Sequence, residues 1–220
     1  LPPPQKVSLK KMFAMPLKDP RFRKIIFLFF LWGLSANFSA PFFSVHMVSQ
    51  LKLSYTFITI CGFVNAVSYV TAVRVWGRIA DKKSFTYSAM LSIVLLGITY
   101  FLWIFTAKGI AATGMIVVVL HISSGIACGG INISLLNIPY EYTPEEGRTV
   151  YLGFNAAISG LIGFVSSMLA SWMVGAMANY RAYLFGLEIT QFQLIFAISG
   201  ILITATGVYI RNFVLKKAHY

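Results

Sequence analysis

Long apolar stretches separated by short polar segments dominate this chain. Six of them cover Ile25–Val48, Thr56–Val75, Phe85–Thr106, Gly109–Ile138, Val150–Ala176 and Gln191–Ile210. None has an Asp, Glu, Lys or Arg in its interior, and about 20 helical residues cross the ~30 Å hydrocarbon core of a bilayer. Continuous apolar runs of this length fit helices, whereas the strands of a membrane barrel alternate in polarity. The pattern therefore predicts an all-α polytopic membrane bundle of six transmembrane helices.

The composition agrees with this class and limits the number of domains. Charged residues make up 11% of the chain and apolar residues 58%, whereas a soluble domain carries roughly 25% charged residues. A length of 220 residues suits one bundle. We expect a cytoplasmic linker over residues 1–24, with a short amphipathic helix around Leu9–Leu17, then a transmembrane domain over residues 25–214 and a cytoplasmic tail over residues 215–220.

Basic residues are distributed unevenly between the two sides of the predicted bundle. Fifteen of the 18 Lys and Arg precede the first span, follow the last span, or lie in the second-to-third and fourth-to-fifth connections. The opposite side holds only Lys52, Lys108 and Arg181. Because Lys and Arg concentrate in cytoplasmic loops, we expect both termini in the cytoplasm. The same rule accounts for the net charge of +12 without a nucleic-acid partner.

The sharpest short motif connects the second and third spans and reads WGRIADKK from Trp76 to Lys83. Gly77 would permit a close helix approach, and Asp81 would favour the positive N-terminus of a helix. Arg78 and Lys82 would hold the connection in the cytoplasm. On the residues alone, an ordinary tight basic turn with an acidic cap explains the motif equally well.

The run Gly77-x-x-x-Asp81-Lys82 resembles the signature loop of the major facilitator superfamily, which recurs in each six-helix half of these carriers. Three more segments are similar to the corresponding regions of that family: Pro16–Arg23, Ala40–Phe43 and Tyr142–Arg148. The likeness extends from about Pro16 to Ile210 and covers six helices where the family has twelve. Ser84 stands where a second Gly is usual, and such erosion is common in the second half's copy.

The resemblance implies the C-terminal half of a major facilitator fold, built as a 3+3 inverted repeat. It implies transport of a small solute by alternating access and a partner six-helix half, either upstream in the same chain or in a second copy. A bacterial inner plasma membrane is the implied location. A gating role for the signature residues and for Arg148 is implied in the same way. Local capping also explains the segment that contains Arg148, because Thr143, Pro144 and Glu146 fit a capping box for the fifth span.

Polar residues at membrane depth are the candidates for a solute site. They come from the first, second, fourth and fifth spans, and they are Asn37, Asn65, Tyr69, His121, Ser124, Asn132 and Asn155. The third and sixth spans lack an interior Asn or His, so we expect four helices to line a polar cavity and two to face lipid. Helix-to-helix hydrogen bonds of ~0.6 kcal/mol each are the alternative explanation, and Gly125-x-x-x-Gly129 suits close packing.

Two histidines fall inside the spans, at different depths. His121 lies near the middle of its span, and an ionisable group there is a functional hypothesis. Since an imidazole titrates near neutral pH, His121 could carry a coupling proton or could donate one hydrogen bond to a solute or a helix. We expect His46, close to the outer end of its span, to lie at the membrane interface. Coupling to a proton or to Na+ stays open.

Two functional hypotheses from different classes follow. The first is a carrier half for a neutral polar solute such as a sugar, although Phe38 and Phe42 leave an amphipathic drug-like solute open. The second is a non-transporting six-helix assembly module. An enzyme is not expected, because no nucleophile motif, metal-ligand set or phosphate-binding Gly loop occurs and Asp19 and Asp81 are far apart. No cofactor is expected.

Overall fold

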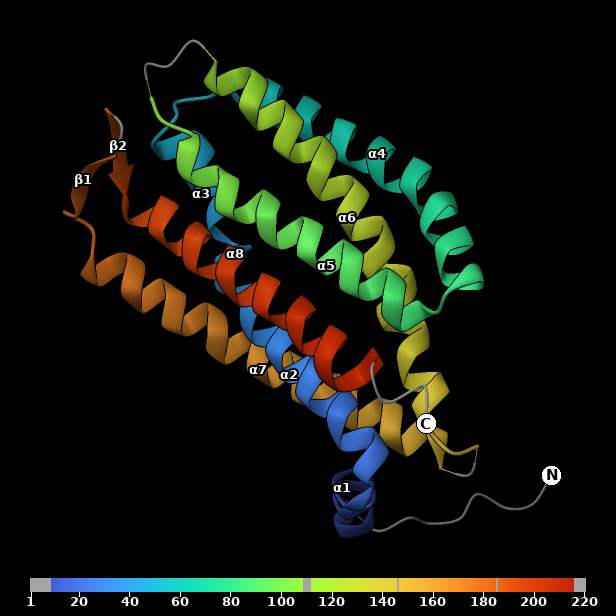
Figure 1. Ribbon diagram of the computed structural model, residues 1–220. Helices are drawn as coiled ribbons and strands as arrows, with labels where there is room; N and C mark the ends of the chain where they lie inside the picture. Colours follow the sequence, from blue (N-terminus) through green and yellow to red (C-terminus); the bar gives the residue numbers. More distant parts are fainter. Residues whose placement is uncertain (1–8, 109–111, 146, 185, 216–220) are drawn as a thin grey trace.

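The fold is a bundle of long helices with one small hairpin at one end (Figure 1), and the computed structural model describes residues 9–108, 112–145, 147–184 and 186–215. In chain order the elements are α1 (Leu9–Lys18), α2 (Pro20–Ser39), α3 (Phe42–Ser49), α4 (Tyr55–Lys82), α5 (Phe85–Leu102), η1 (Trp103–Phe105), α6 (Thr113–Tyr142), α7 (Arg148–Ala176), β1 (Arg181–Leu184), β2 (Leu187–Thr190), α8 (Gln191–Tyr209) and η2 (Ile210–Val214). Within these described residues, six helical segments are long and apolar enough to cross a membrane. The predicted class of an all-α membrane bundle is confirmed.

The long helices lie side by side in the order α4, α6, α5, α8, α2 and α7 (Figure 1). This order has an internal symmetry between the first three spans and the last three. Exchanging the first span with the fourth, the second with the fifth and the third with the sixth turns the α4–α6 contact into the α7–α2 contact, and turns α6–α5 into α2–α8. The α5–α8 contact is unchanged by the exchange. Such pairing is expected of a 3+3 inverted repeat.

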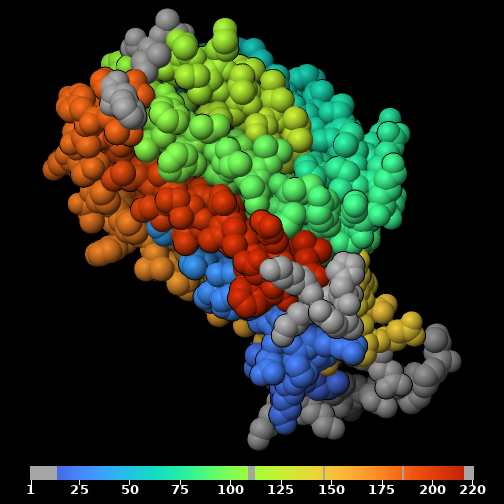
Figure 2. All heavy atoms as spheres, in the orientation of Figure 1, coloured from blue at the N-terminus to red at the C-terminus, as the bar shows by residue number. Residues whose placement is uncertain are grey.

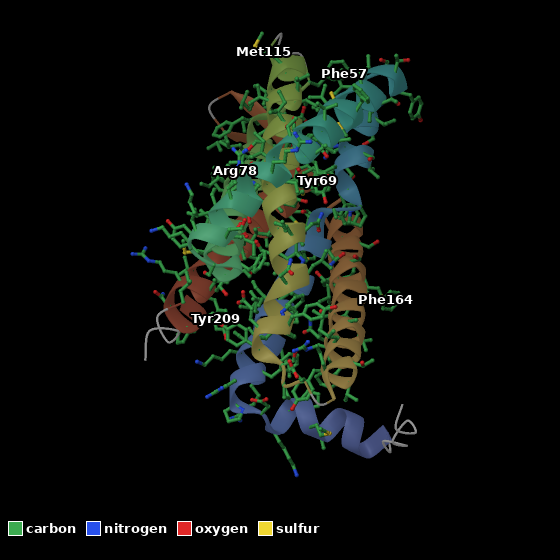
Figure 3. The ribbon with its side chains drawn as sticks, turned by 90° about the vertical axis from the view of Figure 1, so that its right-hand side faces the viewer. Phe57, Tyr69, Arg78, Met115, Phe164 and Tyr209 are labelled. Atoms are coloured by element: carbon green, nitrogen blue, oxygen red, sulfur yellow. The ribbon has the colours of Figure 1, made fainter. Side chains whose placement is uncertain are left out.

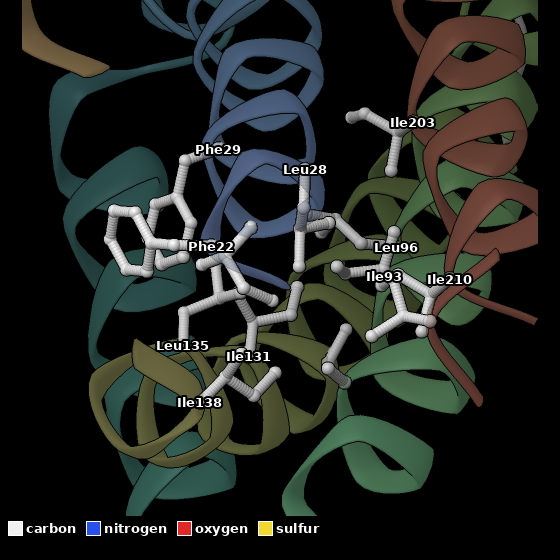
Figure 4. Packing of buried hydrophobic residues seen from close by; sticks show 14 of the residues in the cluster. Phe22, Leu28, Phe29, Ile93, Leu96, Ile131, Leu135, Ile138, Ile203 and Ile210 are labelled. Carbon is white, nitrogen blue, oxygen red and sulfur yellow. The ribbon is translucent and has the colours of Figure 1, made fainter. Parts of the chain in front are cut away.

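Two apolar clusters hold the bundle together, one at each end. Figure 4 shows the larger cluster, which joins α2, α5, α6, α8 and η2 through residues such as Phe22, Ile93 and Ile131. It lies in the half of the bundle nearer α1, called here the α1 end. The second cluster, with Trp103 and Phe196 among its members, lies where α3, η1 and the β1–β2 hairpin meet, called here the hairpin end. Burial of these side chains is expected to rigidify both ends.

The first span is interrupted where the sequence has a proline. Asp19 caps α2, since its carboxylate accepts hydrogen bonds from the backbone N–H groups of Arg21 (2.9 Å) and Phe22 (3.2 Å). The helix ends at Ser39, and α3 begins again at Phe42. Because Pro41 has no N–H to donate to the preceding turn, it breaks the helical ladder. The first span is therefore interrupted at Pro41, and α3 is a short segment at the hairpin end.

The signature motif lies within a helix, which differs from the predicted connection. Helix α4 continues through Trp76 to Lys82, and only Lys83 and Ser84 separate it from α5. The cap of α5 is Ser84, whose hydroxyl accepts from Tyr87 N at 3.0 Å, and Asp81 is exposed on α4. The close approach predicted at Gly77 is wrong: a Cβ added there would meet only Ile133 Cδ1, at an ordinary 3.7 Å.

The predicted capping box before the fifth span is also wrong. Thr143 is the residue that ends α6, and Gly147 caps α7 without a side-chain hydrogen bond. Gly147 has φ of +78°, a left-handed conformation that glycine adopts without the Cβ penalty of other residues. The chain therefore turns at the glycine. Glu146 and the predicted start of the fourth span at Gly109 lie outside the described residues.

The outer surfaces of the helices differ in how much apolar area they leave uncovered. Figure 2 shows α5 and α8 forming one continuous surface on the near face, and their contact is tight because Gly200 lies against the backbone of Phe101. Their outward side chains are apolar, as at Ile98 and Ile201, which is compatible with the lipid contact predicted for these two spans. Helices α4 and α7 are covered least by the rest of the chain, and Figure 3 shows Phe164 of α7 pointing away from the bundle.

A short helix precedes the bundle, as the sequence predicts. Helix α1 contacts α7 and α2 and runs across the end of the bundle instead of along it (Figure 3). A basic amphipathic helix in this orientation suits the plane of a membrane surface.

Candidate functional site

The seam between α4 and α6 brings several of the candidate polar residues together. Gly125 and Gly129 of α6 permit this approach, because a Cβ at Gly125 would collide with the backbone carbonyl of Asn65. A Cβ at Gly129 would lie 3.0 Å from the carbonyl of Tyr69. The close packing predicted for Gly125-x-x-x-Gly129 is confirmed. Small residues allow such contact between membrane helices, and here they set Asn65 beside His121.

A cavity of about 280 Å³ opens beside this seam towards the hairpin end. Its lining comes from α3, α4, α5, η1 and α6, and it consists of Phe43, Gly62, Asn65, Tyr100, Trp103, Leu120, His121 and Ser124. Three of the seven predicted cavity residues, Asn65, His121 and Ser124, therefore share one site. None of these lining residues is an Asp, Glu, Lys or Arg.

Hydrogen bonds define which polar atoms of this cavity are available. The side-chain amide of Asn65 donates from Nδ2 to the backbone carbonyl of His121 at 2.9 Å. The ring of His121 places Nδ1 2.8 Å from the carbonyl of Val117. Because a carbonyl can only accept, Nδ1 carries the hydrogen, and in the neutral ring Nε2 is then an acceptor. Asn65 Oδ1 and His121 Nε2 have no hydrogen-bond partner among the described residues and can accept from a solute.

The remaining wall of the cavity is aromatic. The ring of Phe43 meets Tyr100 edge to face, with centroids 4.7 Å apart, and lies 4.9 Å from Trp103. Trp103 in turn meets His121 edge to face at 5.8 Å. Such rings offer large apolar faces together with polar edges, so the cavity combines hydrogen-bond acceptors on one side with stacking surfaces on the other.

Four of the predicted cavity residues lie elsewhere. Asn132 is exposed and its amide nitrogen is 3.5 Å from Tyr69 Oη, so this pair follows the α4–α6 seam towards the α1 end. Asn37 donates to Gly33 O of its own helix at 3.0 Å and packs against Gly163 of α7. Asn155 is buried, and its Oδ1 has no hydrogen-bond partner among the described residues.

The α2–α7 seam uses its polar residues for packing. Ser167 of α7 donates to the backbone carbonyl of Asn37 at 3.0 Å, and Ser166 donates to the carbonyl of Leu34 at 2.5 Å. Gly153 and Gly160 have open space where a Cβ would be, so not every glycine of α7 contacts another helix. For Asn37 the helix-packing alternative therefore describes the contacts better than a cavity.

The charged residues of the signature motif lie at the α1 end and are exposed, whereas Trp76 is buried and donates from Nε1 to the carbonyl of Ile126 at 2.8 Å. Arg78, Asp81 and Lys82 are exposed. Arg148, the first residue of α7, holds its guanidinium carbon 5.7 Å above the ring of Tyr140. Among described residues the ion pair within 4 Å is Arg181–Glu188, at the opposite end. A gating role for the motif stays a prediction.

His46, expected at the membrane interface, is buried inside the protein at the hairpin end, where the residue is 1% exposed. Its Nε2 is 3.0 Å from Thr106 Oγ1. Position along the span could not predict this burial, because it depends on the contact of α3 with α8.

The aromatic wall was missed by the sequence analysis. Phe43, Tyr100 and Trp103 belong to three elements that the fold brings together. They are only three of the 34 Phe, Tyr and Trp residues in the sequence. The available signal was the position of Tyr100 and Trp103 near the end of a span. That signal is shared by any aromatic residue of a membrane interface, so it could not single them out. No group of three or more His, Cys, Asp or Glu that could hold a metal ion occurs in the part of the chain that the structure describes.

Six apolar spans in a symmetric arrangement, with a polar and aromatic cavity beside the α4–α6 seam, define a polytopic membrane protein. The family model of the Major Facilitator Superfamily matches residues 25–219. The chain therefore belongs to the Major Facilitator Superfamily, and membrane transport is its general function. No curated protein and no solved structure gave a match.

Proposed function

We propose that this chain is the C-terminal half of a secondary-active or facilitative carrier for a small, uncharged, hydroxyl-rich solute. The observation that carries the proposal is the cavity of about 280 Å³ between the α4–α6 seam and the aromatic wall. Its size is close to the lower limit of ordinary ligand pockets, roughly 300–1,000 Å³. A small solute fits such a site better than a bulky one.

The chemistry of the lining favours a hydroxyl-rich solute over an ion. Asn65 Oδ1 and His121 Nε2 accept hydrogen bonds, and Ser124 contributes a hydroxyl that both donates and accepts. Phe43 and Trp103 present ring faces on which the C–H face of a sugar-like ring can pack. A carboxylate, ammonium or phosphate would find no oppositely charged side chain in this lining.

The faces of α4 and α7 support a partner six-helix half. Phe63 on α4 is 69% exposed and Phe164 on α7 is 64% exposed, and large apolar side chains recur along both helices. In the alternating-access mechanism two halves rock around a site between them, so we assign these two faces to the partner. That partner is either an upstream half of the same polypeptide or a second copy, with residues 1–24 as the linker and residues 25–214 as the transmembrane unit.

The distribution of charge supports an orientation with the α1 end in the cytoplasm. Arg21, Arg74, Lys83 and Arg211 all lie towards that end, on four different elements or connections. By the positive-inside rule this end faces the cytoplasm, and we propose a bacterial inner plasma membrane. In this orientation Gly77, Arg78, Asp81, Lys82 and Arg148 lie at the cytoplasmic end, where a gate would separate the cavity from the cell interior.

Uptake by proteoliposomes tests the proposed solute class. We expect the protein to take up a labelled neutral hexose or polyol in preference to a cationic amphipathic compound. Asn65→Ala should raise KM by about 2–10-fold, because one hydrogen bond contributes roughly 0.5–1.5 kcal/mol, and Trp103→Ala should raise it further. Ile201→Ala, on the outward side of α8, is the matched control and should leave KM unchanged.

Four outcomes would change the proposal or one of its parts. Preferential uptake of the amphipathic cation would assign the aromatic wall to a drug-like solute. An unchanged KM in both cavity variants would remove this cavity from the transport pathway. If no solute class enters the vesicles, while the protein binds a membrane partner, the non-transporting assembly module is the better description. If His121→Gln leaves uptake and its pH dependence unchanged, His121 carries no coupling proton.

A further inference from the structure

The hairpin end contains a buried histidine held by a defined set of hydrogen bonds. His46 lies on α3, and its ring is enclosed by Trp103, Phe192 and Phe196 with centroids 6.3, 5.9 and 5.3 Å away. Within the described residues, the side-chain hydrogen bond of the ring joins Nε2 to Thr106 Oγ1, at 3.0 Å. This contact joins α3 to the end of the third span.

The tautomer of His46 follows from the single hydrogen of the Thr106 hydroxyl. Thr106 Oγ1 donates that hydrogen to the carbonyl of Trp103, at 2.7 Å. The hydroxyl oxygen must then accept from His46, so Nε2 carries the ring hydrogen and Nδ1 holds a lone pair. Nδ1 is buried and has no partner among the described residues, which leaves one basic nitrogen able to bind a proton.

The backbone of Thr106, the partner of His46, is held in place by a hydrogen bond from α8. Gln193 of α8 donates from Nε2 to the Thr106 carbonyl at 2.7 Å and to the Glu188 carbonyl at 3.2 Å. A small cavity of about 20 Å³ adjoins His46, Thr106 and Gln193. Since a water molecule needs roughly 10–15 Å³, this cavity has room for about one.

The charged and titratable groups near His46 come from three directions. Lys108 and Glu188 line the small cavity beside it, and Glu188 is paired with Arg181 at 3.0 Å. From α4 the thiol of Cys61 belongs to the same apolar cluster, and from α6 His121 contacts the opposite side of Trp103. None of these groups is within hydrogen-bond distance of Nδ1.

Trp103 connects this histidine to the solute cavity. Its indole lines the cavity, meets His121 at 5.8 Å, and meets His46 at 6.3 Å. A solute that displaces the indole therefore disturbs the packing of His46, and loosening of His46 frees one wall of the cavity. The two sites share one side chain.

We propose that His46 Nδ1 is a proton-binding site at the hairpin end, separate from the solute cavity and coupled to it through Trp103. A proton taken from the aqueous phase on the hairpin side adds to the lone pair of Nδ1 and gives an imidazolium. The packed arrangement offers that new N–H no acceptor, and a buried charge without a partner is unfavourable. Protonation therefore loosens α3 from α8 and η1 and favours an outward opening of the cavity. Only the uptake part of the test rests on the proposed transport function.

The first experiment observes the proton directly, in the full chain labelled with ¹⁵N-histidine in lipid nanodiscs. Single His→Gln variants assign the signals of the three histidines of the sequence. At neutral pH we expect His46 to show the Nε2–H tautomer, with a slowly exchanging proton. Between pH ~8 and ~3, a range wide enough to include a titration displaced from that of a free imidazole, His46 should gain a second proton. Thr106→Val keeps the histidine but should abolish the slow exchange.

Two results of this experiment would overturn the proposal. One is the Nδ1–H tautomer at neutral pH, and the other is a His46 ring that stays neutral across the whole range. His121→Gln serves as the matched comparison and should leave the His46 titration in place. This experiment does not depend on any transported solute.

The second experiment measures uptake while the pH on the hairpin side is varied. With the wild type we expect uptake to rise as pH falls, by up to about tenfold per pH unit for one proton. His46→Gln preserves an N–H donor for Thr106 but cannot gain a proton, so its uptake should be low and vary by less than about twofold, far below the tenfold expected of one titrating site. Thr106→Val should raise uptake at neutral pH. Equal pH profiles for the wild type and His46→Gln would refute the coupling, whereas absence of uptake at every pH would refute the proposed function and leave the proton site to the first experiment.

Discussion

Single glycines decide how closely the helices of this bundle approach one another. Gly125 and Gly129 face the backbone of α4, whereas Gly62 on the partner helix has open space where its Cβ would be. The amide of Asn65 reaches the carbonyl of His121 because α4 and α6 are this close. At the residue scale the cavity therefore depends on the two glycines of α6, which have no side chain, as much as on the residues that line it.

Gly125→Ala is expected to destabilise the protein. The added methyl group would collide with the carbonyl of Asn65 and lie 2.9 Å from Ser68 Cβ, and overpacking of this kind costs about 1–3 kcal/mol. The free energy of unfolding measured by denaturant titration in micelles should fall accordingly.

Gly62→Ala provides the matched control for Gly125→Ala. It adds the same methyl group to α4, in open space, and should leave stability unchanged or raise it by up to about 1 kcal/mol, because Ala favours helix over Gly. Equal losses for the two variants would show that the α4–α6 seam is looser than described.

The elements at the hairpin end are joined by one buried amide. Gln193 closes the capping box at the start of α8, since its Oε1 accepts from both N and Oγ1 of Thr190 at 2.7 Å. Its Nε2 binds the carbonyls of Thr106 and Glu188. At the element scale this side chain holds the start of α8, the end of the third span and the β1–β2 hairpin in one arrangement.

Gln193→Leu should cost more stability than the same change two residues earlier. Gln193→Leu removes the hydrogen-bond partner of the Thr190 N–H and of the Thr106 carbonyl. Each buried polar group left without a partner costs roughly 1–3 kcal/mol, so we expect the free energy of unfolding to fall by at least ~2 kcal/mol. Gln191→Leu removes only a 3.5 Å contact with Arg181 Nη1 and should cost less than half as much. Thermal unfolding of both variants in nanodiscs compares them directly, and similar losses would contradict the bridging role.

The whole molecule has two kinds of apolar surface. On α5 and α8 the outward side chains surround a tight helix pair at the centre of the order of helices. On α4 and α7 the apolar faces belong to the helices that the rest of the chain covers least. We infer that lipid covers the first surface and that protein covers the second.

Photo-crosslinking distinguishes these two surfaces in native membranes. A crosslinking residue at Phe63 of α4 or Phe164 of α7 should join the chain to a protein partner, and the size of the product tells a second copy from an upstream half. The same residue at Ile98 of α5 or Ile201 of α8, which are 50% and 60% exposed, should react with lipid. Lipid products at all four positions would remove the assignment of α4 and α7 to a partner half.

The sequence by itself determined the class, the number of spans and the uneven distribution of charge. These follow from local properties, because a helix in lipid must satisfy its own backbone and because apolar length and Lys or Arg placement are visible in one segment at a time. The break at Pro41 and the close packing at Gly125 were predictable for the same reason. The helical state of Trp76–Lys82 and the turn at Gly147 were not predicted, since motif patterns do not locate helix ends to the residue.

Only the tertiary structure decided which polar residues meet. Asn65, His121 and Ser124 share a cavity while Asn37 and Asn155 belong to another seam, and the candidate list drawn from helical faces could not separate them. The difference arises because a helical face specifies a direction around one axis and leaves open which neighbour it meets. The same reason applies to His46, because α3 packs against α8 and buries a histidine that its position along the span had predicted to be exposed at the membrane surface.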